Sequence, residues 1–285
     1  MSASEPPSNP HYAETAAISA VTEDLTGEVG FRLARFPGRQ VATLWSKAHL
    51  AGLSLSVSET TPLGPAAGPT RFDGRAVVYD ETGDFELRME RCATDKWPFT
   101  ATAHVAAKAQ ATADPTPGAG MIPFLADMRF RAFHPPVQVR SERLEVFGMV
   151  DATVRTDTGQ LTFSAPGKLH EQRGPRQRFA PAFTYLGVVG RQAGLLAVDH
   201  GGAVYGFAWL GGEIKPVESV WIAPPGPSRR FDVGLKGGAS VAGVADLVRA
   251  SSDVVEGKRR PGSTVVARTP FGVMAGQLND WVPDP

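Results

Sequence analysis

Cysteine is almost absent from this sequence, and its scarcity limits both the fold and the compartment. Cys92 is the single cysteine among 285 residues, so a disulfide within the chain and a cysteine-based zinc site are both excluded. A chain without disulfides is typical of a reducing compartment, and we expect a cytoplasmic location. The polar, proline-rich residues 1–10 agree with this, because they lack the basic and apolar regions of a secretory signal.

The sequence also lacks an excess of charge of one sign, and it lacks long apolar runs. Lys plus Arg and Asp plus Glu number 29 each, so the chain has no global basic footprint, which argues against nucleic acid as a partner. No apolar run approaches the roughly 20 residues that cross a bilayer, so we expect no integral membrane segment.

Familiar catalytic motifs are missing as well. The sequence contains no glycine-rich phosphate loop, no Gly-x-Ser-x-Gly turn and no His-Glu-x-x-His run. His170-Glu171 begins like the last of these, but Gly174 stands at the place of the second histidine. The six histidines are dispersed along the chain, and their spacing gives no support for a metal site.

What the sequence has in abundance is turn residues and alternating strands. With 31 glycines and 24 prolines, many turns and few long helices are expected. Residues 53–59 and 85–90 alternate apolar and polar side chains without error, which is the pattern of half-buried strands. Short polar loops at 79–84 and 156–159 predict two hairpins, and four strands within 183–222 are joined by minimal glycine loops. Because no crossover helices are present, a doubly wound α/β fold is excluded.

These patterns predict an all-β chain of two consecutive antiparallel β-barrel or β-sandwich halves with little helix. Residues 1–20 are expected to be a flexible tail, residues 21–137 the first barrel domain and residues 138–285 the second. Each half would hold about six to nine strands, the number that closes a small barrel. The breaker-rich residues 114–120 predict a linker or large loop, and only residues 241–250 show apolar side chains at helical spacing.

The densest polar segment, residues 167–179, is the main candidate for chemistry. His170 can exchange protons near neutral pH, and a glutamate such as Glu171 acquires a raised pKa in a dry cavity and acts as an acid. Arg173 and Arg176 carry guanidinium groups that bind a carboxylate, a phosphate or an enolate oxygen. A solvated loop with structural Arg–Glu pairs is the alternative interpretation.

Strand parity bears on which of the two proton carriers faces the core, but it does not settle the choice. On a straight strand, Glu171 shares the face of Leu169 and His170 points away. A bulge at Pro166-Gly167 would exchange the two faces, so both residues stay candidates.

Aromatic side chains form a second group of candidates. Tyr205, Phe207 and Trp209 share one face of a predicted strand, and Tyr185 and Trp221 lie on strands expected to be near it. Together they would make either an ordinary barrel core or an aromatic wall around an apolar ligand.

The first half holds a smaller group that is the next place for a pocket. Trp45, Lys47 and His49 share one face of a predicted strand. Glu59 ends the following strand on its apolar side, and we expect it to emerge into solvent because burying an unpaired carboxylate is costly.

Two successive β-barrel halves, the second with the run Gly167-Lys168-Leu169-His170-Glu171-Gln172-Arg173-Gly174, resemble the two-domain lipocalin-like superfamily. That group includes carotenoid 1,2-hydratases, AttH-like proteins and fungal lipocalin-like Diels–Alderases. The resemblance covers about residues 25–285. Those relatives carry a glycine-rich His-acid-His/Gln-Trp-Gly run near this place, and Arg173 stands here in the position of the tryptophan. The resemblance implies a hydrophobic pocket within or between two barrels and no organic cofactor.

The residues and the resemblance together predict a cofactor-independent lyase or isomerase. It would hydrate, cyclise or rearrange an apolar polyene, terpenoid or polyketide. His170 or Glu171 would donate or relay a proton, and Arg173, Arg176 or Tyr185 would orient a substrate oxygen. The side chains expected to shape the substrate cavity are Trp45, His49, Tyr205, Trp209 and Trp221. The alternatives are a lipocalin-like carrier that binds an apolar ligand without chemistry and a structural β-protein with filled barrels.

We predict that EDTA leaves the melting temperature of the protein unchanged, because one cysteine and dispersed histidines provide no structural metal site. Differential scanning fluorimetry with and without the chelator measures this. A loss of many degrees on adding EDTA would contradict the prediction.

Overall fold

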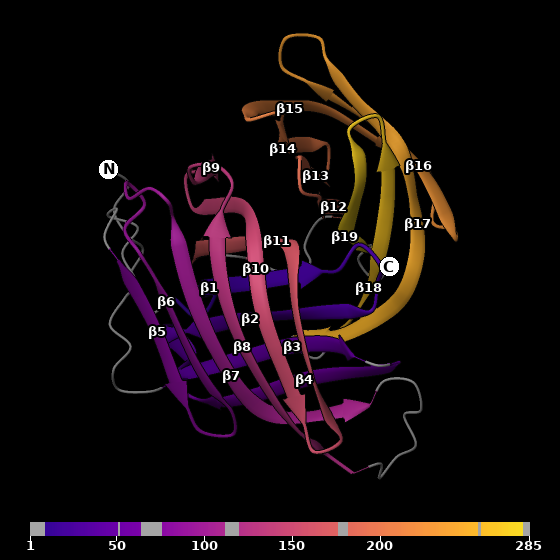
Figure 1. Cartoon of the computed structure of the whole chain (residues 1–285). Coiled ribbons are helices and arrows are strands. Elements are labelled where there is room, and N and C mark those ends of the chain that lie inside the picture. The colour runs from indigo at the N-terminus through magenta and orange to yellow at the C-terminus, as the bar shows by residue number, and fades with distance from the viewer. Residues whose placement is uncertain are drawn as a thin grey trace. The chain divides into compact units, whose positions relative to one another are not determined.

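The described part of the chain is built almost wholly from β-strands. The structure is a computed structural model that describes residues 9–50, 52–63, 76–111, 120–175, 182–255 and 258–281. Over these ranges it holds nineteen strands and a single 3-10 turn, η1 (Pro37–Arg39), which confirms the all-β prediction (Figure 1). The strands fall into two compact units, Met1–Arg176 and Gln177–Pro285.

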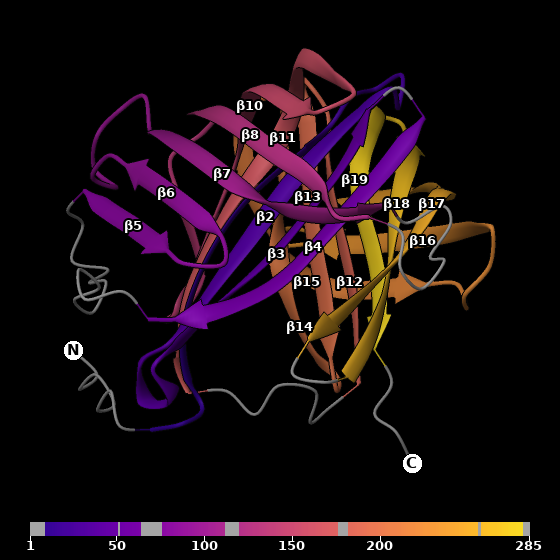
Figure 2. The same ribbon diagram turned by 90° about the horizontal axis from the view of Figure 1, so that it is seen from below.

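The first unit is an antiparallel sheet of eleven strands. Their bounds are β1 (Tyr12–Val21), β2 (Gly27–Phe36), β3 (Val41–Leu50), β4 (Leu53–Pro62), β5 (Val77–Thr82), β6 (Glu86–Arg91), β7 (Thr100–Ala111), β8 (Ile122–Ala132), β9 (Val137–Arg140), β10 (Arg143–Thr156) and β11 (Gly159–Pro175). Neighbours follow the order β4-β3-β2-β1-β11-β10-β8-β7-β6-β5, and β9 pairs with β10. β4 also pairs with β7, with Leu55 opposite Ala111, which joins the sheet back onto itself (Figure 2).

Strand alternation places one face of each strand in a common core. In β6, Leu87 and Met89 are buried whereas Arg88 and Glu90 are exposed, as the alternating sequence predicts. The core takes alternate residues from β1 to β8, β10 and β11. The two expected hairpins are present as the antiparallel pairs β5–β6 and β10–β11. Since each buried Leu or Phe contributes about 1.5–3 kcal/mol, this face fixes the register of the sheet.

Charged side chains also occupy core positions of this unit. Arg35 in β2 donates from Nη1 to Glu14 Oε2 at 2.8 Å and from Nε to Glu81 Oε1 at 2.6 Å. All three residues are buried, and a buried charge is tolerated only when it is paired. Arg35 therefore ties β1 and β5 to β2 at one end of the core.

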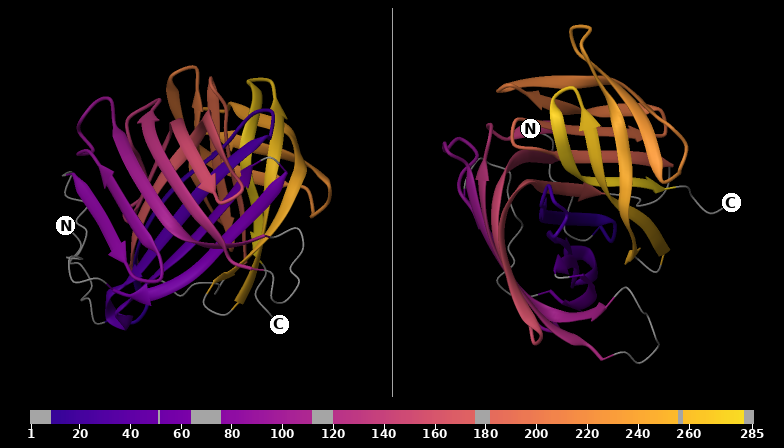
Figure 3. Two further views of the ribbon diagram at one scale, coloured as in Figure 1. Left: turned by 60° about the horizontal axis from the view of Figure 1, so that its bottom comes forward. Right: turned by 45° about the vertical axis from the view of Figure 1, so that its right-hand side comes forward.

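The second unit is a closed barrel of eight antiparallel strands (Figure 3). Their bounds are β12 (Phe183–Val189), β13 (Ala193–His200), β14 (Ala203–Leu210), β15 (Glu213–Ile222), β16 (Ser228–Leu235), β17 (Ser240–Val255), β18 (Lys258–Thr269) and β19 (Gly272–Trp281). The strands neighbour one another in chain order, and β12 pairs with β19 to close the ring. The meander predicted for residues 183–222 is therefore confirmed. Its core includes Leu186, Leu195, Phe231 and Val265.

The units divide at Arg176, not near residue 137 as predicted. β10 and β11 follow residue 137 in the chain, yet they pair with β8 and β1 of the first sheet. Residue 137 itself begins β9, which also pairs with β10. The prediction shared the strands about equally between two barrels, whereas the first sheet needs these long strands to connect its early and late halves.

Two local predictions are wrong because strand pairing decides the outcome. Residues 12–20, expected in a flexible tail, form most of β1, which pairs with β2 and β11 and buries Ile18. Residues 241–250, with apolar side chains at helical spacing, lie in β17. A spacing of four, as between Val241 and Ala245, places two side chains on one face of a strand as well as of a helix.

The remaining predictions of local structure concern a loop and a membrane segment. Residues 114–119 of the predicted linker lie outside the described residues. Within the described ranges, no helix is long and apolar enough to span a bilayer.

We predict that Arg35→Leu lowers the free energy of unfolding by about 3–5 kcal/mol, because it leaves Glu14 and Glu81 buried without their cation. Equilibrium unfolding in urea measures the loss. The matched control is Arg88→Leu, since Arg88 is more than half exposed and pairs on the surface with Asp80. That change is expected to cost less than about 1 kcal/mol, and equal losses for the two variants would refute the prediction.

Candidate functional site

β11 carries the polar run of the sequence and crosses the middle of the first sheet without a bulge. Its pairing with β10 is continuous from Arg143 opposite Gln172 to Thr156 opposite Gly159. The strand therefore runs straight through Pro166-Gly167, and His170 and Glu171 point to opposite faces. Glu171 shares the core face of Leu169.

A line of small residues crosses β1, β11, β10 and β8 next to this run. Ala20 lies opposite Gly167, Gly167 opposite Gly148, and Gly148 opposite Ala132. A Cβ at Gly167 would lie 2.2 Å from the carbonyl oxygen of Ser19, and a Cβ at Gly148 would lie 2.4 Å from that of Arg131. Only glycine allows the backbones to approach this closely.

Glu171 is held in the core of the first unit by an arginine of β6. Arg91 donates from Nε to Glu171 Oε1 at 2.8 Å and from Nη2 to Oε2 at 3.1 Å, and both side chains are fully buried. Burial raises the pKa of Glu171, and the charges of Arg91 and Arg173 oppose that rise. Tyr79 is buried nearby, and desolvation followed by the charge of Glu171 raises its pKa well above the usual value.

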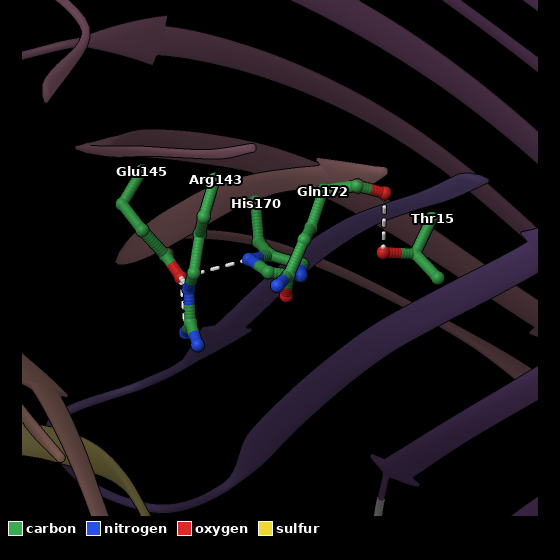
Figure 4. A network of polar contacts seen from close by, with 5 residues as sticks. All are labelled: Thr15, Arg143, Glu145, His170 and Gln172. Atoms are coloured by element: carbon green, nitrogen blue, oxygen red, sulfur yellow. Dashed lines mark hydrogen bonds and ion pairs between the residues drawn. The ribbon is translucent and has the colours of Figure 1, made fainter. Parts of the chain in front are cut away.

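His170 faces the other way and meets a buried carboxylate of β10. Its Nδ1 lies 2.7 Å from Glu145 Oε1, and Arg143 Nε donates to the same oxygen at 2.8 Å (Figure 4). Glu145 is 0% exposed and His170 is 7% exposed. Behind this group, Thr15 Oγ1 donates to the backbone oxygen of Gln172 at 3.0 Å, which ties β1 to β11.

Burial sets the protonation of this pair. Desolvation lowers the pKa of His170 to about 3, although Glu145 acts in the opposite direction. Desolvation alone would raise the pKa of Glu145, but Arg143 and His170 hold it well below the usual range. His170 is thus neutral and Glu145 ionised near pH 7. Because a carboxylate only accepts hydrogen bonds, Nδ1 of His170 is the donor and its Nε2 carries the lone pair.

The register of five strands places further sequence candidates on the same face as His170. Lys168, Ser19, Gly30 and Lys47 lie opposite one another in one row across β11, β1, β2 and β3. The next row contains His170, Ala17, Arg32 and Trp45, with Glu145 opposite His170 on β10. We name these two rows, with the flanking residues Arg143, Glu28 and His49, the His170 face.

Two predicted groups that are far apart in the sequence therefore come together. Trp45 is buried in the same row as His170, and His49 lies two rows away with its Nδ1 2.8 Å from Ser54 Oγ. Lys47, which shares their strand face, is 2.7 Å from Glu28 Oε1. Burial lowers the pKa of Lys168 to about 8, with Glu145 opposing the shift.

Other predicted site residues lie elsewhere. Glu171 and Arg173 occupy the core side of β11, and Arg176 lies outside the described residues. Glu59 is partly exposed.

Except for Trp45 on β3, the aromatic residues predicted to line a cavity belong to the second unit. Tyr185 and Tyr205 lie in one row on β12–β14 with Val198 between them, and Trp209 lies on the same face, which is opposite to the barrel core. Trp221 on β15 is 57% exposed.

Sequence reasoning missed Glu145 and Arg143, which complete the polar group. A signal was present: β10 is apolar on both faces from Val146 to Val150, which is the pattern of a strand buried on both sides. Charged residues that begin such a strand are therefore buried and need partners. The group does not resemble a metal centre, and no cluster of three or more His, Cys, Asp or Glu suited to a metal occurs among the described residues.

Comparisons with known proteins identify the fold. No family model matches the sequence, and no curated protein matches it. The structure is similar to that of CghA, with a TM-score of 0.57 and 13% identity over 96% of this chain and 88% of that one. The structure of CghA with Sch210972 gives 0.56 and 12% over 96% and 89%. Kievitone hydratase from Nectria haematococca gives 0.50 and 8% over 98% and 90%. The chain therefore shares its fold with these structures over nearly its whole length, in agreement with the two-part all-β fold that the resemblance predicted.

We predict that His170 stays neutral in the folded protein between pH 5 and 8. As a result, it lowers the free energy of unfolding as the solution becomes acidic. The unfolded state binds a proton below about pH 6.5, whereas folded His170 does so only near pH 3. The free energy of unfolding therefore falls as the pH drops from 6.5 to 5, by up to about 1.4 kcal/mol per pH unit. In His170→Gln this slope becomes shallower, as measured by urea unfolding at each pH.

The control for that measurement is His11→Gln, because His11 is exposed. Its slope should equal that of the unaltered protein. An imidazole resonance of His170 that titrates near pH 6.5 in NMR spectra would show the prediction to be wrong.

Proposed function

We propose that the chain is a cofactor-independent lyase or isomerase that moves a proton on an apolar small molecule bound at the His170 face. The observation that carries this proposal is the buried, neutral His170 whose Nδ1–H donates to ionised Glu145. Among the described residues nothing hydrogen-bonds its Nε2, so this atom is the base. A positioned histidine of this kind contributes about 10²–10⁴-fold to a rate.

The arrangement supports proton transfer in both directions. When His170 Nε2 takes a proton from carbon or from water, the Glu145 carboxylate stabilises the imidazolium that forms. Arg143 fixes that carboxylate, so the ring keeps its orientation. The same imidazolium then returns the proton to another atom of the substrate. Addition of water to an alkene, double-bond isomerisation and cyclisation all consist of such steps.

Glu171 is assigned a structural role in this proposal. Its two oxygens accept from Arg91 inside the core, on the face opposite to His170. Trp45, in the row of His170, is proposed to pack against the apolar part of the substrate. The shared fold with kievitone hydratase supports the choice of reaction class, because that neighbour is by name a hydratase.

The substrate is to be found by native mass spectrometry of the protein after incubation with an extract of small apolar metabolites. We expect one compound to be retained and its mass or its retention time in chromatography to change with time. Retention without any change would favour the carrier function instead.

We predict that His170→Gln lowers turnover of that compound by about 10²–10⁴-fold while the circular dichroism spectrum stays that of a β-protein. Glutamine keeps a hydrogen bond to Glu145 but cannot take up a proton near neutral pH. Glu59→Gln, a partly exposed carboxylate, is the control and should change turnover little. If Glu171→Gln abolishes turnover and His170→Gln does not, the proton carrier is Glu171 on the core face.

A further inference from the structure

The second unit carries an open groove on the outer face of its barrel. The groove encloses about 510 Å³, and its lining includes residues 242–244 of β17, Trp221 of β15 and Pro270, which follows β18. Val241 and Ala245 belong to the barrel core. Because side chains alternate along a strand, the side chains at 242 and 244 point outward. The groove is therefore open to a partner from outside the barrel.

The groove is bordered by apolar side chains that are exposed. Trp221 is 57% exposed. Phe271, in the turn between β18 and β19, is exposed, and so is Val273, which lies opposite Arg268 at the start of β19. Exposed apolar side chains that gather in one place mark a site of interaction, and tryptophan is among the residues that contribute most to binding at protein interfaces.

The strand register shows which side chains share this outer surface. One row across β15, β16 and β17 holds Trp221, Asp232 and Ala242. The next row, across β16, β17 and β18, holds Arg230, Val244 and Arg268. We name these six residues the Trp221 face. The surface thus carries both a protruding aromatic side chain and a groove with room for one.

The Trp221 face also carries one free charge of each sign. Arg268 forms an ion pair with Asp246, which in turn accepts from Ser228 Oγ at 2.6 Å. Arg230 and Asp232 are both exposed, and neither side chain has a hydrogen bond or ion pair with another described residue. They lie two positions apart on the same face of β16. An acidic or a basic partner would match only one of them, whereas a partner with the same arrangement would match both.

We propose that the Trp221 face binds a second copy of this chain about a two-fold axis. In a two-fold interface the same patch meets itself, so that a residue i contacts j of the other copy and j contacts i. Arg230 of each copy then pairs with Asp232 of the other, and Trp221 of each enters the groove of the other. The inference does not depend on the reaction proposed above, because none of these residues belongs to the His170 face.

Sedimentation velocity of the full chain tests this association over protein concentrations from about 1 µM to about 1 mM, because an interface of few residues forms a weak complex. We expect the mass to rise with concentration from the 30.2 kDa of one chain toward twice that mass. Trp221→Ser should raise the dissociation constant of the dimer at least about tenfold, because it removes the aromatic side chain that the groove receives.

Charge reversal identifies the pairing between copies. Arg230→Asp places a carboxylate against Asp232 of the other copy, and Asp232→Arg places a cation against Arg230. Each variant alone should therefore stay monomeric, since like charges repel. An equimolar mixture of the two variants should regain the dimer, because each carboxylate of one variant then meets a cation of the other. The double variant, in which the two charges are exchanged, should dimerise as well.

The matched control is Arg129→Asp, an exposed arginine of β8 in the first unit, which should leave the dimer unchanged. Circular dichroism spectra check that each variant keeps the β fold. A chain that sediments as a monomer at every concentration would overturn the inference and leave the Trp221 face to another partner, and this measurement needs no variant. A dimer that Trp221→Ser or the single charge reversals leave unchanged would also overturn it, as would a mixture of the two reversed variants that stays monomeric.

Discussion

The antiparallel pairing of β11 with β10 and β1 is the constraint on which both faces of the first unit depend. Side chains of a strand alternate with a period of two, so an unbroken register fixes Leu169 and Glu171 in the core and Lys168 and His170 on the other side. A slip of β11 by one residue would turn His170 toward the face of Arg91 and would remove the hydrogen bond from His170 to the buried Glu145. The candidate site is therefore as firmly placed as the apolar core that fixes this strand.

The buried polar groups of the two faces are stabilised in different ways. On the core face, Arg91 and Glu171 form a bidentate ion pair, and Arg35 donates hydrogen bonds to two carboxylates. On the other face, His170 gives up its charge and becomes a neutral donor to Glu145. Glu145 accepts from His170 and Arg143 through Oε1 alone, and its Oε2 has no hydrogen-bond partner among the described residues. A buried polar atom without a hydrogen-bond partner costs stability on either face, and Nη2 of Arg35 is such an atom on the core face.

The sequence could predict what depends on local alternation and could not predict what depends on distant pairing. The period of two predicted the strands and the hairpins and put His170 and Glu171 on opposite faces, because these follow from neighbouring residues alone. Which of the two faces the core needed the unbroken register with β10. The period of two also put Trp45 and His49 on one face. The sequence could not predict that Glu145 is the partner of His170. The two residues are 25 positions apart, and their pairing depends on the register of β10 against β11. The predicted position of the domain boundary was wrong for the same reason, because nothing local in β10 or β11 shows that they pair with β8 and β1.

The line of small residues formed by Ala20, Gly167, Gly148 and Ala132 has a consequence for how the sheet can assemble. A slide by two residues keeps every side chain on its proper face, so the apolar pattern alone does not forbid it. Such a slide would bring Ala165 or Leu169 to the place of Gly167, where a Cβ would meet the carbonyl oxygen of Ser19 at 2.2 Å. The glycines thus exclude the register of β11 against β1 that is shifted by two residues. They thereby keep Lys168 and His170 in the same rows as Lys47 and Arg32.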